Sequence, residues 1–233
     1  MNDVVLVVLC GLAGVVVGNV LTVVVEEVPA RRPVGPAVKT LVRGRRLSGG
    51  RHSPLLEVAT AVLFGLAALR FGADWVLPAF LIFFASLIAV AVIDLEHYIV
   101  PNRIVLWTLM ASVPLLAAAA LLEGEWDSLG GALLGALAAG GGLLVVNLIS
   151  PRGMGMGDVK LAVVLGLFLG WLDLAHVVLG LFLGFLLGAV GGIILIALRL
   201  RSRSDHVPFA PFLAAGAALA VLAGSGVLDW YLG

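Results

Sequence analysis

Long uninterrupted apolar runs constrain the fold of this chain more than any other feature of its sequence. Eight runs can be drawn, and most approach the roughly 17 to 25 residues that an α-helix needs to cross a bilayer. They are continuous rather than alternating between apolar and polar residues, which favours helices over the strands of a membrane barrel. The sequence therefore predicts an all-α polytopic integral membrane protein with about eight transmembrane helices. The runs cover approximately residues 4–25, 55–70, 76–93, 104–122, 129–149, 159–172, 174–198 and 207–224.

The composition excludes an ordinary soluble domain. Hydrophobic residues make up 62% of the chain and charged residues 12%, whereas soluble domains carry about a quarter charged residues. The single cysteine, Cys10, lies inside the first run, so one chain can form neither a disulfide nor a cysteine zinc site. The first run has no basic segment before it and no small-residue cleavage site, which predicts a retained helix rather than a signal peptide. No nucleic-acid-binding motif is found.

The charges predict how the helices are oriented. Lys and Arg gather on the cytoplasmic side of membrane proteins. If the eight runs alternate in direction and the N-terminus lies outside, every Lys and Arg except Arg70 falls on the cytoplasmic side. Seven of the 14 acidic residues, among them Asp74, Glu123 and Asp173, then fall outside. We therefore expect a multi-pass protein of the inner (plasma) membrane with both termini outside.

Three parts are predicted along the chain. Residues 1–25 form the first transmembrane helix. Residues 26–54 form a basic cytoplasmic loop, rich in Pro and Gly and without cysteine, that is expected to touch the anionic head groups of the lipid bilayer. Residues 55–233 form a seven-helix membrane domain that carries the candidate site.

Two aspartates are predicted to lie at the same depth. Asp94 ends the third apolar run and Asp158 begins the sixth, in the stretch GMGMGDVK. Because these runs cross in opposite directions, both residues fall at the cytoplasmic ends of their helices. Charged residues there are costly and mark functional sites. Two close carboxylates can share one proton and act as general base and general acid on a peptide bond; sequence does not assign the two roles.

Other residues are candidates for supporting this pair. Gly153, Gly155 and Gly157 are expected to allow backbone conformations and close approaches that other residues forbid, so that a flexible or closely packed loop lets an extended peptide reach Asp158. Lys160 is expected to extend toward the inner membrane surface. Glu57 lies at the start of the second run, where a negative charge is favourable to the helix dipole. The four histidines show no metal-ligand spacing, so no metal site is predicted.

The two aspartate segments resemble those of a known family. AVIDLEHYIVPN and GMGMGDVKLAVVLGLFLGW are similar to the motifs of the type IV prepilin peptidases, membrane aspartic proteases of the GxGD class, and VGNVLTVVVEEVP, SPLLEVATAVLFGL and VPFAPFLAAGA extend the resemblance along the chain. The resemblance implies that Asp94 and Asp158 form the catalytic dyad and that Gly155 and Gly157 are the motif glycines. It also implies cleavage of the positively charged leaders of prepilins and pseudopilins after a glycine, at the cytoplasmic face. Glu57 and Glu96 are then candidate acids for binding such a leader, and a helix-start charge remains the alternative explanation of Glu57.

The chain also departs from this family, in which many members carry two CxxC pairs in the first cytoplasmic loop. Residues 26–54 contain none, so zinc is not expected there. Many members also methylate the new N-terminus with S-adenosylmethionine. Whether this chain also has the methyltransferase activity stays open. The proteolysis itself needs no cofactor. An alternative function of another class is an ion-coupled transporter that uses membrane-embedded aspartates.

Overall fold

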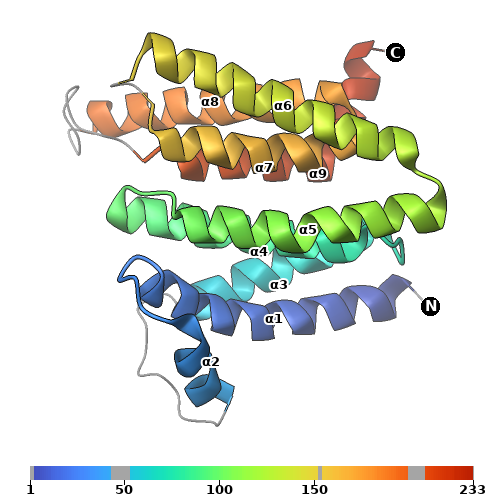
Figure 1. Cartoon of the computed structure of the whole chain (residues 1–233), viewed down its shortest axis with the longest axis vertical. Helices are drawn as coiled ribbons and strands as arrows, with labels where there is room; N and C mark the ends of the chain where they lie inside the picture. The colour runs from blue at the N-terminus through green and yellow to red at the C-terminus, as the bar shows by residue number, and fades with distance from the viewer. Residues whose placement is uncertain (1–2, 43–52, 152–153, 199–207, 233) are drawn as a thin grey trace.

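The protein is a bundle of antiparallel helices. The computed structural model describes residues 3–42, 53–151, 154–198 and 208–232, and within these ranges the regular elements are helices, without a strand. The long helices alternate in direction, so the start of α1 and the end of α9 lie at the same end of the molecule (Figure 1). The helices are α1 (Asp3–Glu27), α2 (Val34–Val42), α3 (Ser53–Phe71), α4 (Leu77–His97), α5 (Asn102–Glu123), α6 (Trp126–Ile149), α7 (Met156–Leu172), α8 (Leu174–Ala197) and α9 (Ala210–Leu232).

Most of these helices can cross a membrane. In the described part of the chain, seven helices are long and apolar enough to do so, namely all except α2 and α7. The 17 residues of α7 lie at the lower limit of spanning length, but α7 runs beside α6 through the bundle (Figure 1). The prediction of an all-α polytopic membrane protein is therefore confirmed.

The helix boundaries correct the sequence analysis in two places. Residues 26–54 were expected to form a loop only, but part of this segment folds into α2, a short helix with Lys39 in its last turn. The rest of the segment includes residues 43–52, which lie outside the described residues. In addition, α4 continues to His97, beyond the apolar run drawn at residues 76–93, and Asp94 lies in its last turn.

Prolines and left-handed residues set the helix ends near the candidate site. Pro101 precedes α5, and its carbonyl accepts hydrogen bonds from the backbone of Ile104 and Val105. Pro211 lies in the first turn of α9, where its missing N–H costs no hydrogen bond. At the end of α4, Tyr98 adopts φ 55°, which turns the chain out of the helix. These local features fix where α4 ends and where α5 and α9 begin.

Glycines bring α6 and α7 into unusually close contact. A Cβ atom on Gly166 would lie 2.1 Å from the carbonyl oxygen of Gly135, and one on Gly170 would lie 2.3 Å from that of Gly131. Apolar side chains gain little by moving from lipid into the protein, because lipid tails are equally apolar. Contacts between small residues instead let the helix backbones pack directly against each other. This packing holds α7 in the bundle despite its short length.

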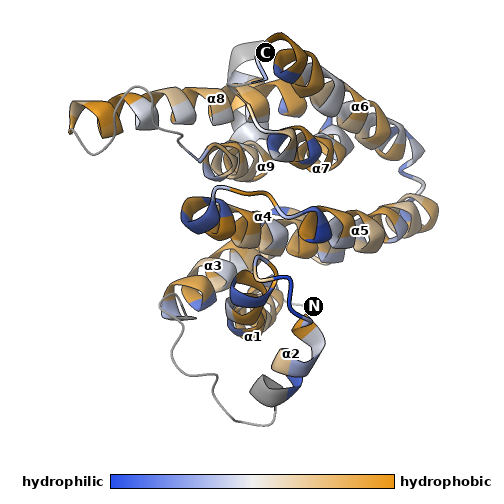
Figure 2. Ribbon diagram, turned by 60° about the vertical axis from the view of Figure 1, so that its left-hand side comes forward, coloured by the Kyte–Doolittle hydropathy of each residue, from blue (hydrophilic) through white to orange (hydrophobic). Residues whose placement is uncertain are grey.

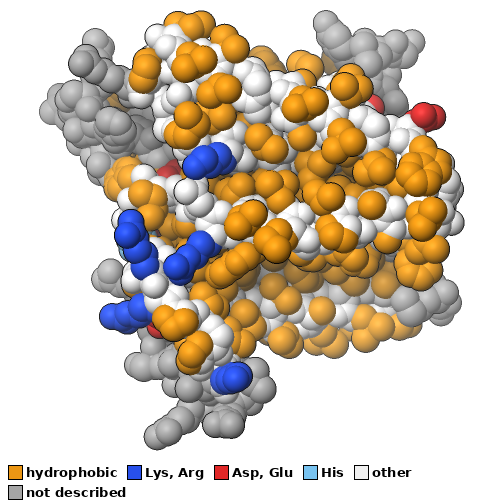
Figure 3. Space-filling view, in the orientation of Figure 1, with side chains coloured by type: hydrophobic (Ala, Val, Ile, Leu, Met, Phe, Trp, Pro, Cys, Tyr) orange, Lys and Arg blue, Asp and Glu red, His pale blue; other side chains and the backbone are white. Residues whose placement is uncertain are grey.

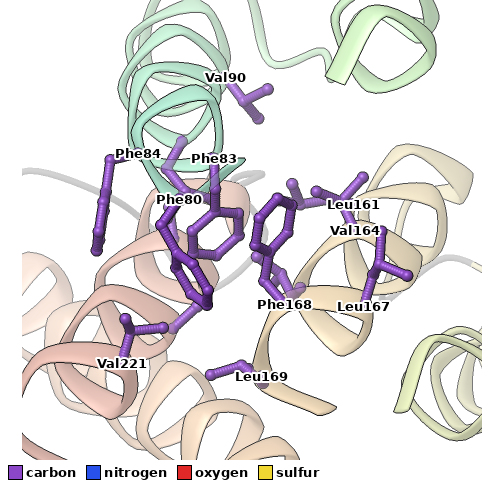
Figure 4. Close-up of a cluster of buried hydrophobic side chains, with 14 of the residues drawn as sticks. Phe80, Phe83, Phe84, Val90, Leu161, Val164, Leu167, Phe168, Leu169 and Val221 are labelled. Atoms are coloured by element: carbon purple, nitrogen blue, oxygen red, sulfur yellow. The ribbon is translucent and has the colours of Figure 1, made fainter. Parts of the chain in front are cut away.

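A cluster of phenylalanines fixes α4 against α7. The ring of Phe168 on α7 stacks on Phe83 of α4 with centroids 4.3 Å apart, and it meets Phe80 edge-on at 5.1 Å (Figure 4). All three side chains are fully buried. Aromatic pairs of this kind contribute roughly 0.5 to 1.5 kcal/mol beyond the area that they bury. The two helices that carry Asp94 and Asp158 therefore have a rigid common core.

The α1–α3 pair offers a test of glycine packing. A Cβ on Gly14 would lie 2.6 Å from Cα of Ala61, whereas a Cβ on Gly11 would lie 3.9 Å from the Ala61 carbonyl oxygen. Gly14→Ala should therefore lower the thermal unfolding midpoint in detergent, since overpacking costs about 1 to 3 kcal/mol. Gly11→Ala is the matched control and should leave the midpoint unchanged. Equal midpoints for the two variants would contradict the close contact.

A chain of polar contacts ties three helices at the end of the bundle where α1 starts and α9 ends. The ring Nδ1 of buried His176 lies 2.8 Å from Oδ2 of Asp173, and its Nε2 lies 3.5 Å from Oγ of Ser225. Arg70 of α3 also donates a hydrogen bond to Ser225 Oγ on α9. Arg70 is the one basic residue that the charge analysis placed outside, and this contact gives it a structural role.

The contact between Asp173 and His176 predicts a pH-dependent stability. Partial burial alone would raise the pKa of Asp173, but hydrogen bonds from the His176 ring and backbone, together with the His176 charge, lower it below its usual 3.8. A carboxyl group whose pKa is lowered by folding stabilises the fold at pH values above its ordinary pKa. That stabilisation is lost as the pH falls through the lowered pKa. Asp173→Asn should therefore lower the unfolding midpoint at pH 7, and the difference from wild type should shrink as the pH falls below 3.8. Asp3→Asn, at an exposed position, should show no such pH-dependent difference.

Candidate active site

Asp94 is buried in the last turn of α4 and faces the start of α9. Its side chain is 5% exposed. Its Oδ2 accepts a hydrogen bond from the backbone N–H of Ala210, the first residue of α9, at 3.1 Å. The free N–H groups at a helix start carry partial positive charge, which favours an anionic partner. The position of α9 therefore orients the Asp94 carboxylate.

Asp158 is buried in the first turn of α7. It is 8% exposed, and its Oδ2 accepts a hydrogen bond from the backbone N–H of Gly155 at 3.3 Å. In return the carbonyl of Gly155 accepts from the N–H of Asp158 at 3.1 Å. The preceding loop is anchored as well, because Asn147 of α6 donates to the carbonyl of Met154 at 2.7 Å.

The structure brings the two aspartates together. They lie close enough for the charge of Asp94 to act on Asp158, and the α4 end and the α7 start lie at the same end of the bundle (Figure 1). Figure 2, in which this end comes forward, shows hydrophilic residues there on otherwise apolar helices. In Figure 3 the visible Lys and Arg side chains gather over the same end. Two buried carboxylates thus share the basic end of the molecule.

Of the two properties expected of the glycines near Asp158, the structure shows a close approach at Gly157 and no special backbone conformation at Gly155 or Gly157. Neither Gly155 nor Gly157 has a positive φ, so neither supplies a conformation that other residues avoid. A Cβ on Gly155 would meet only ordinary contacts, at 3.5 Å or more. A Cβ on Gly157 would lie 2.8 Å from Cβ of Val100. Gly157 is therefore needed for close packing of α7 against the segment that follows α4, and Gly153 lies outside the described residues.

Lys160 contacts the start of α5. Its Nζ donates a hydrogen bond to Oδ1 of Asn102 at 2.8 Å, and both side chains are exposed. The sequence analysis had expected Lys160 only to extend toward the membrane surface. The contact instead links α7, two residues after Asp158, to the first residue of α5.

The other two candidate acids have different surroundings. Glu57 lies in the first turns of α3, where its Oε1 accepts a hydrogen bond from Asn19 of α1 at 2.8 Å. Glu96 is exposed on α4, and its Oε2 lies 3.9 Å from Nδ1 of His97. The described contact of Glu57 therefore joins α1 to α3, and Glu96 faces outward from the end of α4.

No metal centre is evident in the part of the chain that the structure describes. Among those residues, no three His, Cys, Asp or Glu side chains are grouped so that they could hold an ion. Asp94 and Asp158 bring two carboxylates to this site.

Sequence reasoning missed three contacts of the site. The amide of Ala210 is a backbone group, and no residue type announces it. Asn102 follows Pro101 at a predicted helix start, where a polar residue usually has a structural role. Its position therefore gave no reason to pair it with Lys160. Val100 is one of many apolar residues, and only the coordinates show that it lies against Gly157.

Comparison with known proteins agrees on one family. The sequence model described as the type IV leader peptidase family matches residues 81–196. A prepilin leader peptidase/N-methyltransferase of Bacillus subtilis is 38% identical over 179 residues, covering 77% of this chain and 69% of that protein. The protein of the same name from Pseudomonas aeruginosa is 34% identical over 203 residues, covering 84% and 69%. No solved structure gave a significant match. The chain therefore belongs to the type IV leader peptidase family.

Proposed function

We propose that this protein removes the N-terminal leader of prepilins or pseudopilins, cleaving after a leader glycine at the cytoplasmic face of the inner membrane. The observation that carries this proposal is the pairing of two buried carboxylates, Asp94 and Asp158, at the basic end of a membrane bundle. Membership of the leader peptidase family supplies the substrate class. The basic end is assigned to the cytoplasm because Lys and Arg gather on that side.

The proposed reaction is hydrolysis by an aspartate dyad. One carboxylate removes a proton from a water molecule as the water oxygen attacks the scissile carbonyl carbon. The other, protonated, donates its proton to the carbonyl oxygen, which gives a neutral tetrahedral intermediate. Collapse of the intermediate breaks the C–N bond: the carboxyl group that took the proton from water gives it to the departing amine, and the other carboxylate takes a proton back from a hydroxyl group of the intermediate. The N–H groups of Ala210 and Gly155 would keep each carboxylate in place through these steps.

The division of the chain is also proposed. Residues 1–25 and 26–54 would form the first span and a basic cytoplasmic segment, and residues 55–233 the peptidase domain. Residues 81–196, which match the family model, lie inside this domain. Glu57 and Glu96 would lie at the same membrane face as candidate contacts for a positively charged leader.

Co-expression with a candidate prepilin, followed by mass spectrometry of its N-terminus, tests the proposal. We expect a mature N-terminus that begins directly after the leader glycine. A substrate that keeps its complete leader would contradict the proposal. The names of the relatives include N-methyltransferase, and the same spectrum reports whether the new N-terminus is methylated. An added methyl group would show that S-adenosylmethionine is used. An unmethylated N-terminus would indicate a peptidase alone.

A further inference from the structure

The segment that joins α4 to α5 is attached to the first turn of α7 at two successive points. Val100 packs against Gly157 so closely that a Cβ there would lie 2.8 Å from the valine Cβ. Two residues later, Asn102 accepts the hydrogen bond from Lys160 at 2.8 Å. The segment begins with Tyr98, whose left-handed backbone follows α4 directly. Residues 98–102 are therefore held by α4 at one end and by α7 at the other.

This attachment connects the two parts of the site. Asp94 lies four residues before Tyr98, and its backbone carbonyl accepts a hydrogen bond from the Tyr98 N–H at 2.9 Å. Asp158 lies between Gly157 and Lys160, the two residues of α7 that hold the segment. A shift of residues 98–102 away from α7 would therefore change the separation of the two carboxylates.

We propose that Asn102 and Lys160 are positioning residues, whose hydrogen bond holds the segment after α4 against α7 and so fixes the spacing of the Asp94–Asp158 pair. The inference rests on the proposed function. An exposed hydrogen bond contributes little to overall stability. Its effect should therefore appear in the chemical step, where a displacement of about 1 Å can cost up to 10²-fold in rate.

A matched pair of variants at Asn102 tests the proposal. Asn102→Leu keeps the size of the side chain but removes the acceptor, and it should lower kcat for prepilin cleavage by about 10-fold with little change in KM. Asn102→Asp restores an acceptor for the ammonium group and should stay within about 3-fold of wild type. Lys160→Met should match Asn102→Leu, and the double variant should be no slower than either single variant.

Two controls separate this role from a general effect of charge at the membrane surface. Arg103→Gln removes the neighbouring exposed cation and should leave kcat unchanged. If Lys160 only anchors the helix in lipid, Lys160→Met will slow cleavage while Asn102→Leu will not, and that result would overturn the proposal. Additive losses in the double variant would overturn it as well.

A crosslinking measurement tests the contact without relying on activity. Asn102→Cys with Lys160→Cys, in a chain whose Cys10 is changed to Ser, should be bridged in membranes by a short reagent that joins two thiols. Absence of the bridge would overturn the contact. A bridged protein whose wild-type parent cleaves no prepilin would instead contradict the proposed function.

Discussion

Asp94→Asn and Asp158→Asn should each reduce leader cleavage by about 10³-fold or more. Asparagine keeps the size of the side chain and can still accept the hydrogen bond from Ala210 or Gly155, so the fold should survive. It can neither take up nor release the proton that hydrolysis requires. The measurement is the rate at which a purified prepilin is converted to its mature form, with the amount of folded enzyme checked by thermal unfolding.

Asp127→Asn is the matched control for this prediction. Asp127 is exposed in the first turn of α6, at the opposite end of the bundle from the dyad. We expect its variant to cleave at the wild-type rate. Cleavage that persists in both dyad variants would refute the aspartate mechanism and would return attention to the ion-coupled transporter, the other use of membrane-embedded aspartates.

Gly157→Ala should lower activity strongly, and Gly155→Ala should not. At position 157 the added methyl group would meet Val100 at 2.8 Å, and the first turn of α7 must move away from residues 98–102. We expect cleavage to fall at least about 10-fold, because such a displacement alters the spacing of the carboxylates. At position 155 the nearest neighbour is the Asp158 Oδ2 at 3.5 Å, an ordinary contact. The two variants are compared by the initial rate of prepilin processing.

A second substitution distinguishes a steric effect from a change in backbone flexibility. Val100→Gly removes the atom that the new methyl group would meet, so it should restore part of the activity to Gly157→Ala. If flexibility were the important property, the two alanine variants would be equally impaired and Val100→Gly would rescue neither.

Much of the architecture was predictable because a bilayer imposes simple rules on sequence. The apolar runs gave all the long helices, and the alternation of direction put Asp94 and Asp158 at one end, as the structure has them. The short helix α2 was missed because it has only nine residues and contains Gly35 and Pro36, which are typical of loops. A longer α4 was also missed, since its last turn contains the polar residues that end an apolar run.

Contacts within the site were less predictable than its residues. The spacing of glycines before Asp158 indicated a functional segment, but it did not show why a glycine is needed at position 157. The close approach to Val100 depends on how two helix ends meet. The hydrogen bond between Asn102 and Lys160 joins residues 58 positions apart. Pairings at such separation follow from helix packing, which the order of residues does not display.

The hydrogen bond from Ala210 to Asp94 has a consequence for how the protein is made. The two residues are 116 positions apart, and Ala210 begins the last helix. While the chain is being synthesised, α4 and α7 are both in the membrane before α9 exists, so Asp94 lacks the amide that orients it until the last helix is inserted. A chain that stops before residue 208 would hold both aspartates and would still lack the backbone N–H that orients Asp94.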